Sequence, residues 1–384
     1  MYRLSPQQEA ILGKAREIKV KVIAPNAERV DSEGIFPKES IDALAMEGFM
    51  GLTIAPEYGG MGQGLRVACA VLDEIAQGCA STAMVYLMHL CGVAAYSSAP
   101  SKTGNYLRAS AKGTHLSTLA WSEFGSRSHF WAPVSQEKRE NGKVTVNAAK
   151  SFVTSAGHAD GYVVTTQWSE AQNPLESTLY LVLRGDQGIR ITGPWNALGL
   201  RGNMSAPMRM DNVAVGEERA LTEPGKGLGP MLNVVLPVFN LGNAAISVGI
   251  SETAVQATQR HITTSKFDYL GTTLADLPNE RARLAQIRIE TDKARAHLTC
   301  VIDAVEQPSP STLLLVLESK AAAAETALLV TDIAMRACGG TGFTKGLGIE
   351  RPFRDARAAA VMAPTTDVLH EFIGRALCGM EVLG

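Results

Sequence analysis

Two changes of hydrophobic period along the chain constrain its fold more than any other feature. From about residue 5 to 112, apolar residues recur at the spacing of amphipathic or buried helices. Near Thr114 the pattern becomes an alternation of apolar and polar residues, clearest in 143–148 and 179–183, with turn residues between such runs. From Leu232 the helical spacing returns. The order is therefore helices, then strands, then helices again.

We predict an α+β multidomain protein from this order. Residues 1–113 would form an N-terminal helical domain and residues 114–219 a central β-barrel or β-sandwich domain. Residues 220–384 would form a C-terminal four-helix bundle, because four long apolar segments joined by short linkers are typical of up-down bundles. The four expected helices span about 232–267, 280–305, 310–338 and 353–378.

Charge and cysteine usage narrow the classes of partner. The net charge of −2 gives no basic field that would attract nucleic acid or a membrane surface, and the apolar run Leu313–Leu317 is too short to span a bilayer. The six cysteines form no CxxC pair and no Cys/His metal spacing, so we expect no metal site. Free, reduced cysteines are typical of a cytoplasmic protein, and we expect that location.

Five segments in order along the chain resemble motifs of the acyl-CoA dehydrogenase family. The most specific is the Gly-Gly-x-Gly stretch 335–343 with the Arg-Asp-Ala-Arg segment that follows it, ending at Arg357. The others are the glycine-rich loop 55–62 and the segments 123–129, 150–156 and 199–203. The resemblance covers nearly the whole chain. It implies the same three-part fold and an FAD cofactor between the β domain and the bundle.

The resemblance also implies which residues would hold FAD. Ser122 and Thr154 would bond the flavin ring, beside Trp121, and Phe152 would stack on it in place of the family's Trp. An isoalloxazine ring needs such an apolar slot with an aromatic wall and polar donors. The remaining members of the expected cofactor set are Ser128 at the pyrophosphate, Arg336, Gly339 and Gly340 toward a neighbouring subunit, Thr365, and Asp367.

The catalytic carboxylate of the family has no counterpart at either of its usual positions. Aligning the Arg-Asp-Ala-Arg segment places Ala363 at the common Glu, and Phe239 falls at the alternative one on an earlier helix. A base is needed because the α C–H of a thioester is weakly acidic. It could come from Asp367, His370 or Glu371, so the catalytic residue stays unassigned.

Three functions remain open. The first is an FAD-dependent oxidoreductase that oxidises an acyl-CoA or similar acyl thioester at Cα–Cβ and passes electrons to an external acceptor. The second is a flavin-dependent monooxygenase on the same fold, using reduced flavin from a flavin reductase and O2. The third is a non-catalytic flavin-binding subunit. From the resemblance to the acyl-CoA dehydrogenase family we expect a homotetramer, because the FAD of one subunit would reach a second subunit.

Overall fold

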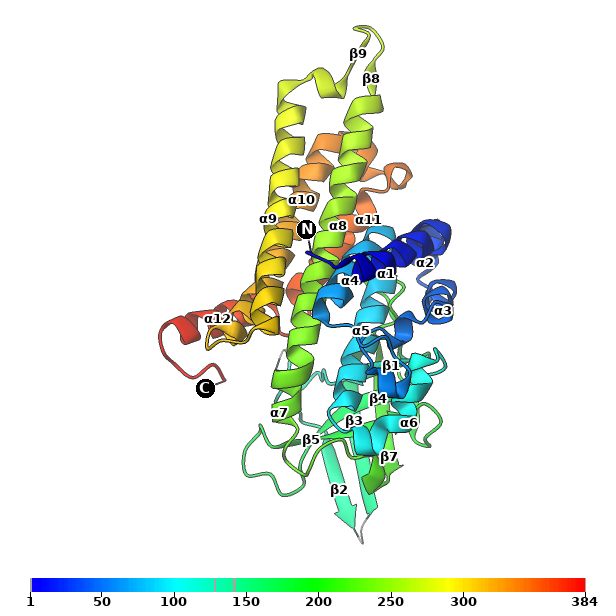
Figure 1. Cartoon of the computed structure of the whole chain (residues 1–384), viewed down its shortest axis with the longest axis vertical. Helices are drawn as coiled ribbons and strands as arrows, with labels where there is room; N and C mark the ends of the chain where they lie inside the picture. Colours follow the sequence, from blue (N-terminus) through cyan, green and yellow to red (C-terminus); the bar gives the residue numbers. More distant parts are fainter. Residues whose placement is uncertain (1, 128, 141–142, 384) are drawn as a thin grey trace.

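The computed structural model describes residues 2–127, 129–140 and 143–383 and has the expected three-part order (Figure 1). A helical N-terminal part lies beside a long helical bundle, and a curled sheet lies at one end of the molecule. The N-terminal helices are α1 Pro6–Ile18, α2 Ala24–Glu33, α3 Lys38–Met46, α4 Leu65–Gly78, α5 Ala80–Ser97 and α6 Pro100–Ala111, with a π-helical turn, η1, at Lys19–Ile23 and short 3-10 turns η2 Phe49–Gly51 and η3 Pro56–Tyr58.

The central part is a mixed sheet in which β4 and β5 are buried along nearly their whole length. Neighbouring strands follow the order β1-β4-β2-β3-β7-β6, and β5 pairs with β4. The β1–β4 pair is parallel, whereas β3 pairs with β2 and β7 in antiparallel fashion. The strands are β1 Ser117–Ala120, β2 Gln136–Glu140, β3 Lys143–Val153, β4 Gly161–Gln167, β5 Ser177–Leu183, β6 Ile189–Ile191 and β7 Ala206–Val215.

Three long helices and two shorter ones make up the C-terminal part. They are α8 Leu236–Thr264, α9 Pro278–Glu306, α10 Thr312–Phe343, α11 Glu350–Val361 and α12 Thr366–Leu377. Short elements connect them: η4 Glu217–Arg219, α7 Leu228–Pro230, η5 Met231–Val235, the hairpin β8 Lys266–Phe267 and β9 Thr272–Thr273, η6 Leu274–Asp276, and η7 Lys345–Leu347.

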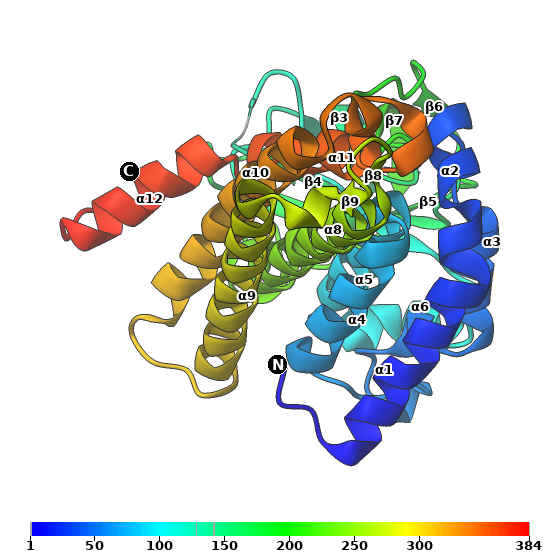
Figure 2. The same cartoon turned by 90° about the horizontal axis from the view of Figure 1, so that it is seen from above.

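The predicted fourth helix, 353–378, is two helices rather than one. It breaks after Val361, because Pro364 has no N–H to continue the helical ladder, and α12 then starts at Thr366. Seen from above, α12 projects away from the rest of the bundle (Figure 2). The Gly-Gly-x-Gly segment holds the expected break between two helical stretches: α10 consists of two stretches that meet in a kink at Gly339, where φ is 54°.

Helix α8 is the centre of the molecule, with α9 and α10 on one side and α4 and α5 on the other (Figure 2). The segment Leu228–Thr264 is long and apolar enough to cross a membrane by length and composition. However, 78% of the most apolar 18-residue stretch of this segment is buried inside the protein, as expected for a core helix.

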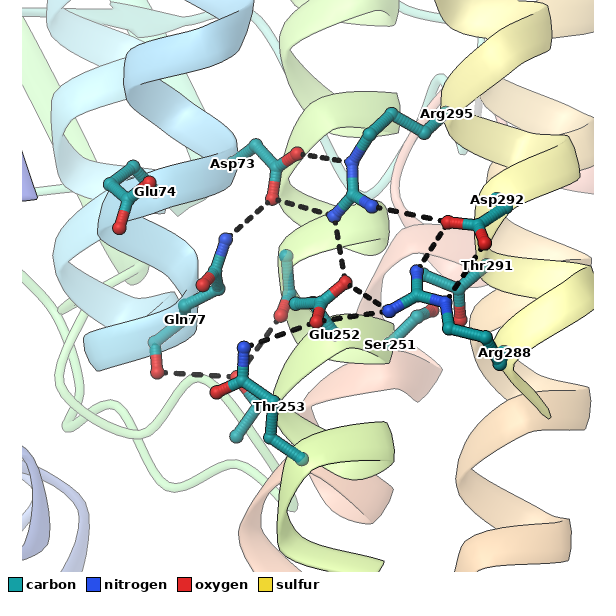
Figure 3. A network of polar contacts seen from close by, with 12 residues as sticks. Asp73, Glu74, Gln77, Ser251, Glu252, Thr253, Arg288, Thr291, Asp292 and Arg295 are labelled. Carbon is teal, nitrogen blue, oxygen red and sulfur yellow. Dashed lines mark hydrogen bonds and ion pairs between the residues drawn. The ribbon is translucent and has the colours of Figure 1, made fainter. Parts of the chain in front are cut away.

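A buried network of ion pairs fastens α4 to α8 and α9 (Figure 3). The guanidinium of Arg295 on α9 donates to Asp73 on α4, at 2.9 Å, and to Glu252 on α8, at 3.1 Å. Arg288 also donates to Glu252, at 2.9 Å. These partners keep the pKa of Glu252 below its usual range despite its burial. The network therefore joins the two helical parts of the chain through charges that satisfy one another.

Candidate functional site

A cavity of about 700 Å³ opens between the sheet and the C-terminal helices. That volume lies within the range typical of small-molecule sites. Its lining is mostly apolar and aromatic, with a few polar groups. Its walls come from the end of β1, the end of β3, the segment 195–205, the start of α8, and α11 with the residues that follow it.

The sheet presents Phe152 to this cavity through an irregularity in β3. The pairing of β3 with β7 shifts register between Lys150 and Val153, and Phe152 has φ 54°, a conformation that a non-glycine residue rarely adopts. The bulge turns the Phe152 ring outward, where it is 61% exposed. The rings of Phe124 and Trp195 lie 6.1 and 6.4 Å from it, so an aromatic cluster borders the cavity.

Polar groups lie beside that aromatic cluster. Trp121, Ser122 and Thr154 line the cavity, and the Thr154 hydroxyl bonds the Ser205 hydroxyl at 2.9 Å. The Trp121 indole N–H is buried and has no acceptor among the described residues. A buried donor without an acceptor is costly, so this N–H is an unsatisfied polar group within the cavity wall.

Glu123, which lines the cavity, forms an ion pair with Lys150, which does not. Both side chains are fully buried, and the Lys150 ammonium also donates to the carbonyl of Thr165 at 2.6 Å. The Glu123 carboxylate accepts from the backbone N–H groups of Val134 and Ser135 at 2.7 and 2.9 Å. The Lys150 ammonium and these two N–H groups hold the pKa of Glu123 below its usual range, so the carboxylate is ionised and fully engaged.

The helical wall carries Phe239 on α8 and Ala363 after α11, the two positions predicted from the sequence to correspond to the family's catalytic Glu. Glu123 is the one carboxylate among the described residues of the lining, and its carboxylate is held in the ion pair with Lys150. The cavity therefore offers no available carboxylate base within the described part of this chain.

The alternative bases considered from the sequence lie outside the cavity. Asp367 is exposed near the start of α12. His370 faces Glu325 across 3.3 Å, and Glu371 lies 3.7 Å from Arg375 on the same helix. None of the three lines the cavity, so this chain alone does not bring the expected substitutes for the missing base into the site.

Four residues of the expected cofactor set meet in the cavity: Trp121, Ser122, Phe152 and Thr154. Ser128 lies outside the described residues.

The rest of the set lies away from the cavity. Arg336 is exposed and pairs with Asp332 at 3.1 Å, and a Cβ added to Gly339 or Gly340 would meet no atom within 4 Å. The Thr365 hydroxyl caps α12 by accepting from the N–H of Val368.

Several residues of the cavity were not predicted as site residues. Trp195, which anchors its segment by donating to the Leu200 carbonyl at 3.0 Å, follows a turn-rich stretch with no motif. Arg357 had appeared only as part of a motif. It lines the cavity, stacks on the Phe353 ring and donates to Thr331. The sequence signal that could have marked it is a basic residue six positions before Ala363, the predicted catalytic position.

His89 belongs to the core rather than to the cavity. Its ring is completely buried, one nitrogen faces the Met50 carbonyl at 2.8 Å, and the other accepts from the Ser117 N–H at 3.2 Å. Burial lowers the pKa of His89 to about 4, so the ring is neutral.

Three consecutive family models match this chain. The acyl-CoA dehydrogenase N-terminal domain matches residues 5–114, the middle domain 118–213 and the C-terminal domain 225–378. A curated relative, the cyclohex-1-ene-1-carbonyl-CoA dehydrogenase of Geobacter metallireducens, is 26% identical over 98% of this chain and 99% of its own length.

Solved structures show the same fold. Butyryl-CoA dehydrogenase from Megasphaera elsdenii has a TM-score of 0.92 at 22% identity, covering 98% of this chain and 99% of that chain. The FAD complex of PigA has a TM-score of 0.90 at 18% identity, covering 98% of each chain. Because the three domain models together match nearly its whole length, this protein belongs to the acyl-CoA dehydrogenase family, oxidoreductases that act on CH–CH groups.

Proposed function

We propose that the protein binds FAD in the cavity and oxidises an acyl-CoA, or a similar acyl thioester, at Cα–Cβ. The observation that carries this proposal is that Trp121, Ser122, Phe152 and Thr154, all expected to hold the flavin ring, line one cavity. A flavin ring has acceptor atoms for hydroxyl donors and a face for an aromatic ring. The family supports FAD over other cofactors, and bound FAD would supply the hydride acceptor.

Four residues would hold the flavin ring: Trp121, Ser122, Phe152 and Thr154. Ser128 would contact the pyrophosphate. We assign Arg336, Gly339 and Gly340 to the cofactor of a neighbouring subunit, since the open surface at both glycines leaves room for another backbone or ligand. We also keep Thr365 and Asp367 in the proposed cofactor set. Neither lines the cavity of this chain, so we assign their contact with FAD to the cofactor of the second subunit. The proposed domains are 1–113, 114–219 and 220–384.

The assembly and partners follow from the same proposal. A subunit whose cofactor reaches its neighbour requires at least a dimer, and we propose a homotetramer in the cytoplasm. The side chain of Phe343, next to the open glycines, is 82% exposed, as expected of a surface that a second subunit covers. Electrons would leave to an external acceptor protein.

This chain's residues would orient the substrate and exclude water rather than remove its α-proton through a carboxylate. Phe239 and Ala363 present apolar surface where the proton would depart. This specific observation favours a second candidate, a monooxygenase that uses reduced flavin from a flavin reductase and O2 and needs no α-proton base. A non-catalytic flavin-binding subunit would have the same cavity and neither activity.

An anaerobic titration separates these functions. The purified protein is loaded with FAD and titrated with acyl-CoAs that have straight, branched or cyclic acyl groups, while the oxidised flavin band near ~450 nm is followed. Cyclic acyl groups belong in the panel because the named relative from Geobacter metallireducens acts on one. Bleaching by any member supports the dehydrogenase.

Two other results count against it. If FAD binds and no acyl-CoA bleaches it, the dehydrogenase is refuted, and oxygenated products formed after reduction by a flavin reductase would establish the monooxygenase. If the protein fails to bind FAD at all, both catalytic proposals fail. A matched Phe152→Ala variant shows whether any bound flavin occupies this cavity.

A further inference from the structure

Lys320 is a fully buried lysine in the middle of α10. It follows Glu318 and Ser319 and precedes four alanines, and neither Glu318 nor Ser319 pairs with its ammonium. Its ammonium forms no ion pair within the described part of the chain, and burial alone lowers its pKa to about 7. A buried lysine without a carboxylate is costly and needs another set of acceptors.

Three backbone carbonyls are those acceptors. The Nζ of Lys320 donates to the oxygens of Ala359, Met362 and Pro364 at 2.8, 3.1 and 2.8 Å. An ammonium group has three N–H bonds, so all its donors are used. The three carbonyls belong to the end of α11 and to the connection that leads to α12.

That connection has few other ways to satisfy its backbone. The last carbonyls of a helix have no intrahelical partner, and Pro364 brings no N–H to supply one. The Ala358 carbonyl accepts from the Met362 N–H at 3.0 Å, and Lys320 takes the next free one, at Ala359. A cation at this end also interacts favourably with the dipole of α11.

The same connection is a wall of the cavity. Met362, Ala363 and Pro364 all line it, and Ala363 is a position predicted from the sequence to correspond to the family's catalytic Glu. Lys320 lies behind this wall and is not itself part of the lining.

We propose that Lys320 is a positioning residue that fixes the path of residues 362–364 and thereby directs the side chain at position 363 into the cavity. The inference rests on the proposed function only in taking the cavity as the reaction site. Its structural part concerns the protein without any ligand, so it can be tested separately.

A cysteine placed at position 363 reports the state of this wall. The starting variant replaces the exposed Cys300 and Cys378 with serine and carries Ala363→Cys; the other four cysteines are buried. Alkylation by iodoacetamide is followed site by site by mass spectrometry, with and without Lys320→Met. Methionine reaches as far as the lysine Cε and removes all three donors.

We expect Lys320→Met to speed alkylation at position 363 by about tenfold or more, because three buried carbonyls lose their partner. The native Cys338, buried on the same helix, is the internal control and should label as slowly as before. An unchanged rate at position 363 overturns the proposal, and so does an equal rise at Cys338, which would mean that Lys320 only holds the whole helix in place.

A second variant covers the case in which Lys320→Met does not fold. Lys320→Gln keeps two donors on a shorter side chain, so it should give a smaller rise at position 363; no rise refutes the proposal. If the acyl-CoA titration succeeds, Lys320→Met should lower kcat more than it changes KM. If the titration fails, the alkylation result still stands alone, which keeps the two failures distinguishable.

Discussion

Replacing Lys150 with methionine should destabilise the protein by about 3–5 kcal/mol, the usual cost of leaving one partner of a buried ion pair alone. The Glu123 carboxylate would keep only its two backbone donors, and the Thr165 carbonyl would lose its ammonium. For a chain of 384 residues this corresponds to a fall of about 5 °C in Tm. Urea unfolding and calorimetry measure it.

The control is the double variant that also carries Glu123→Gln. Glutamine keeps an acceptor oxygen for the Val134 and Ser135 N–H groups and removes the buried charge, so the double variant should recover about 2–4 kcal/mol of the loss. In Lys150→Met alone, the pKa of Glu123 rises above its unfolded value. Stability should then be greatest at low pH and fall as pH rises through the new pKa.

Two results would refute this reasoning. A single variant that loses less than about 1 kcal/mol would show that water or relaxation satisfies the carboxylate. A double variant whose loss equals the sum of its single changes would show that Glu123 and Lys150 are not coupled. Either result would also remove the reason to consider Glu123 unavailable as a base.

Three further predictions concern the core and the cavity. The neutral His89 contributes stability that is fully present above pH 6.5 and is lost as pH falls toward 4, up to about 3 kcal/mol. In urea unfolding, the stability of His89→Gln should lack this pH dependence. Parallel pH profiles of the two proteins would contradict the prediction. Phe152→Ala should weaken FAD binding about tenfold in equilibrium dialysis while Phe152→Trp preserves it; equal affinities would exclude stacking on this ring. Ala363→Glu should speed flavin bleaching by acyl-CoA by about 10²-fold or more in stopped-flow traces, and Ala363→Gln should not; no gain from Glu would mean that a base already acts elsewhere.

The sequence predicted the order of the three parts because hydrophobic period follows backbone geometry and survives along long segments. It did not predict the break between α11 and α12 correctly, although Pro364 marks it, because apolar spacing continues on both sides. The helix expected over 310–338 does end at a break: Gly339, with φ 54°, separates the two helical stretches of α10.

The cavity could be predicted only where motifs lie on strands. Trp121, Ser122, Phe152 and Thr154 converge because the segment that follows β1 runs along the end of β3, where the Ser151 N–H donates to the Ser122 carbonyl at 2.8 Å. Residues brought in by tertiary packing carry no comparable local pattern, as for Trp195 and Arg357. The burial of Lys320 could have been suspected from its alanine-rich surroundings, but its three carbonyl partners depend on the path taken after α11.

The ion-pair network between α4, α8 and α9 has a consequence for the order of synthesis. Asp73 leaves the ribosome long before Glu252 and Arg295, which bind it in the finished protein, and the whole sheet is made in between. Until α8 and α9 emerge, α4 lacks cover on the face that packs against α8, although α1 and α5 already contact it. That face must therefore wait about 220 residues, the separation of Asp73 and Arg295, and a fragment that stops before α9 would not complete the network.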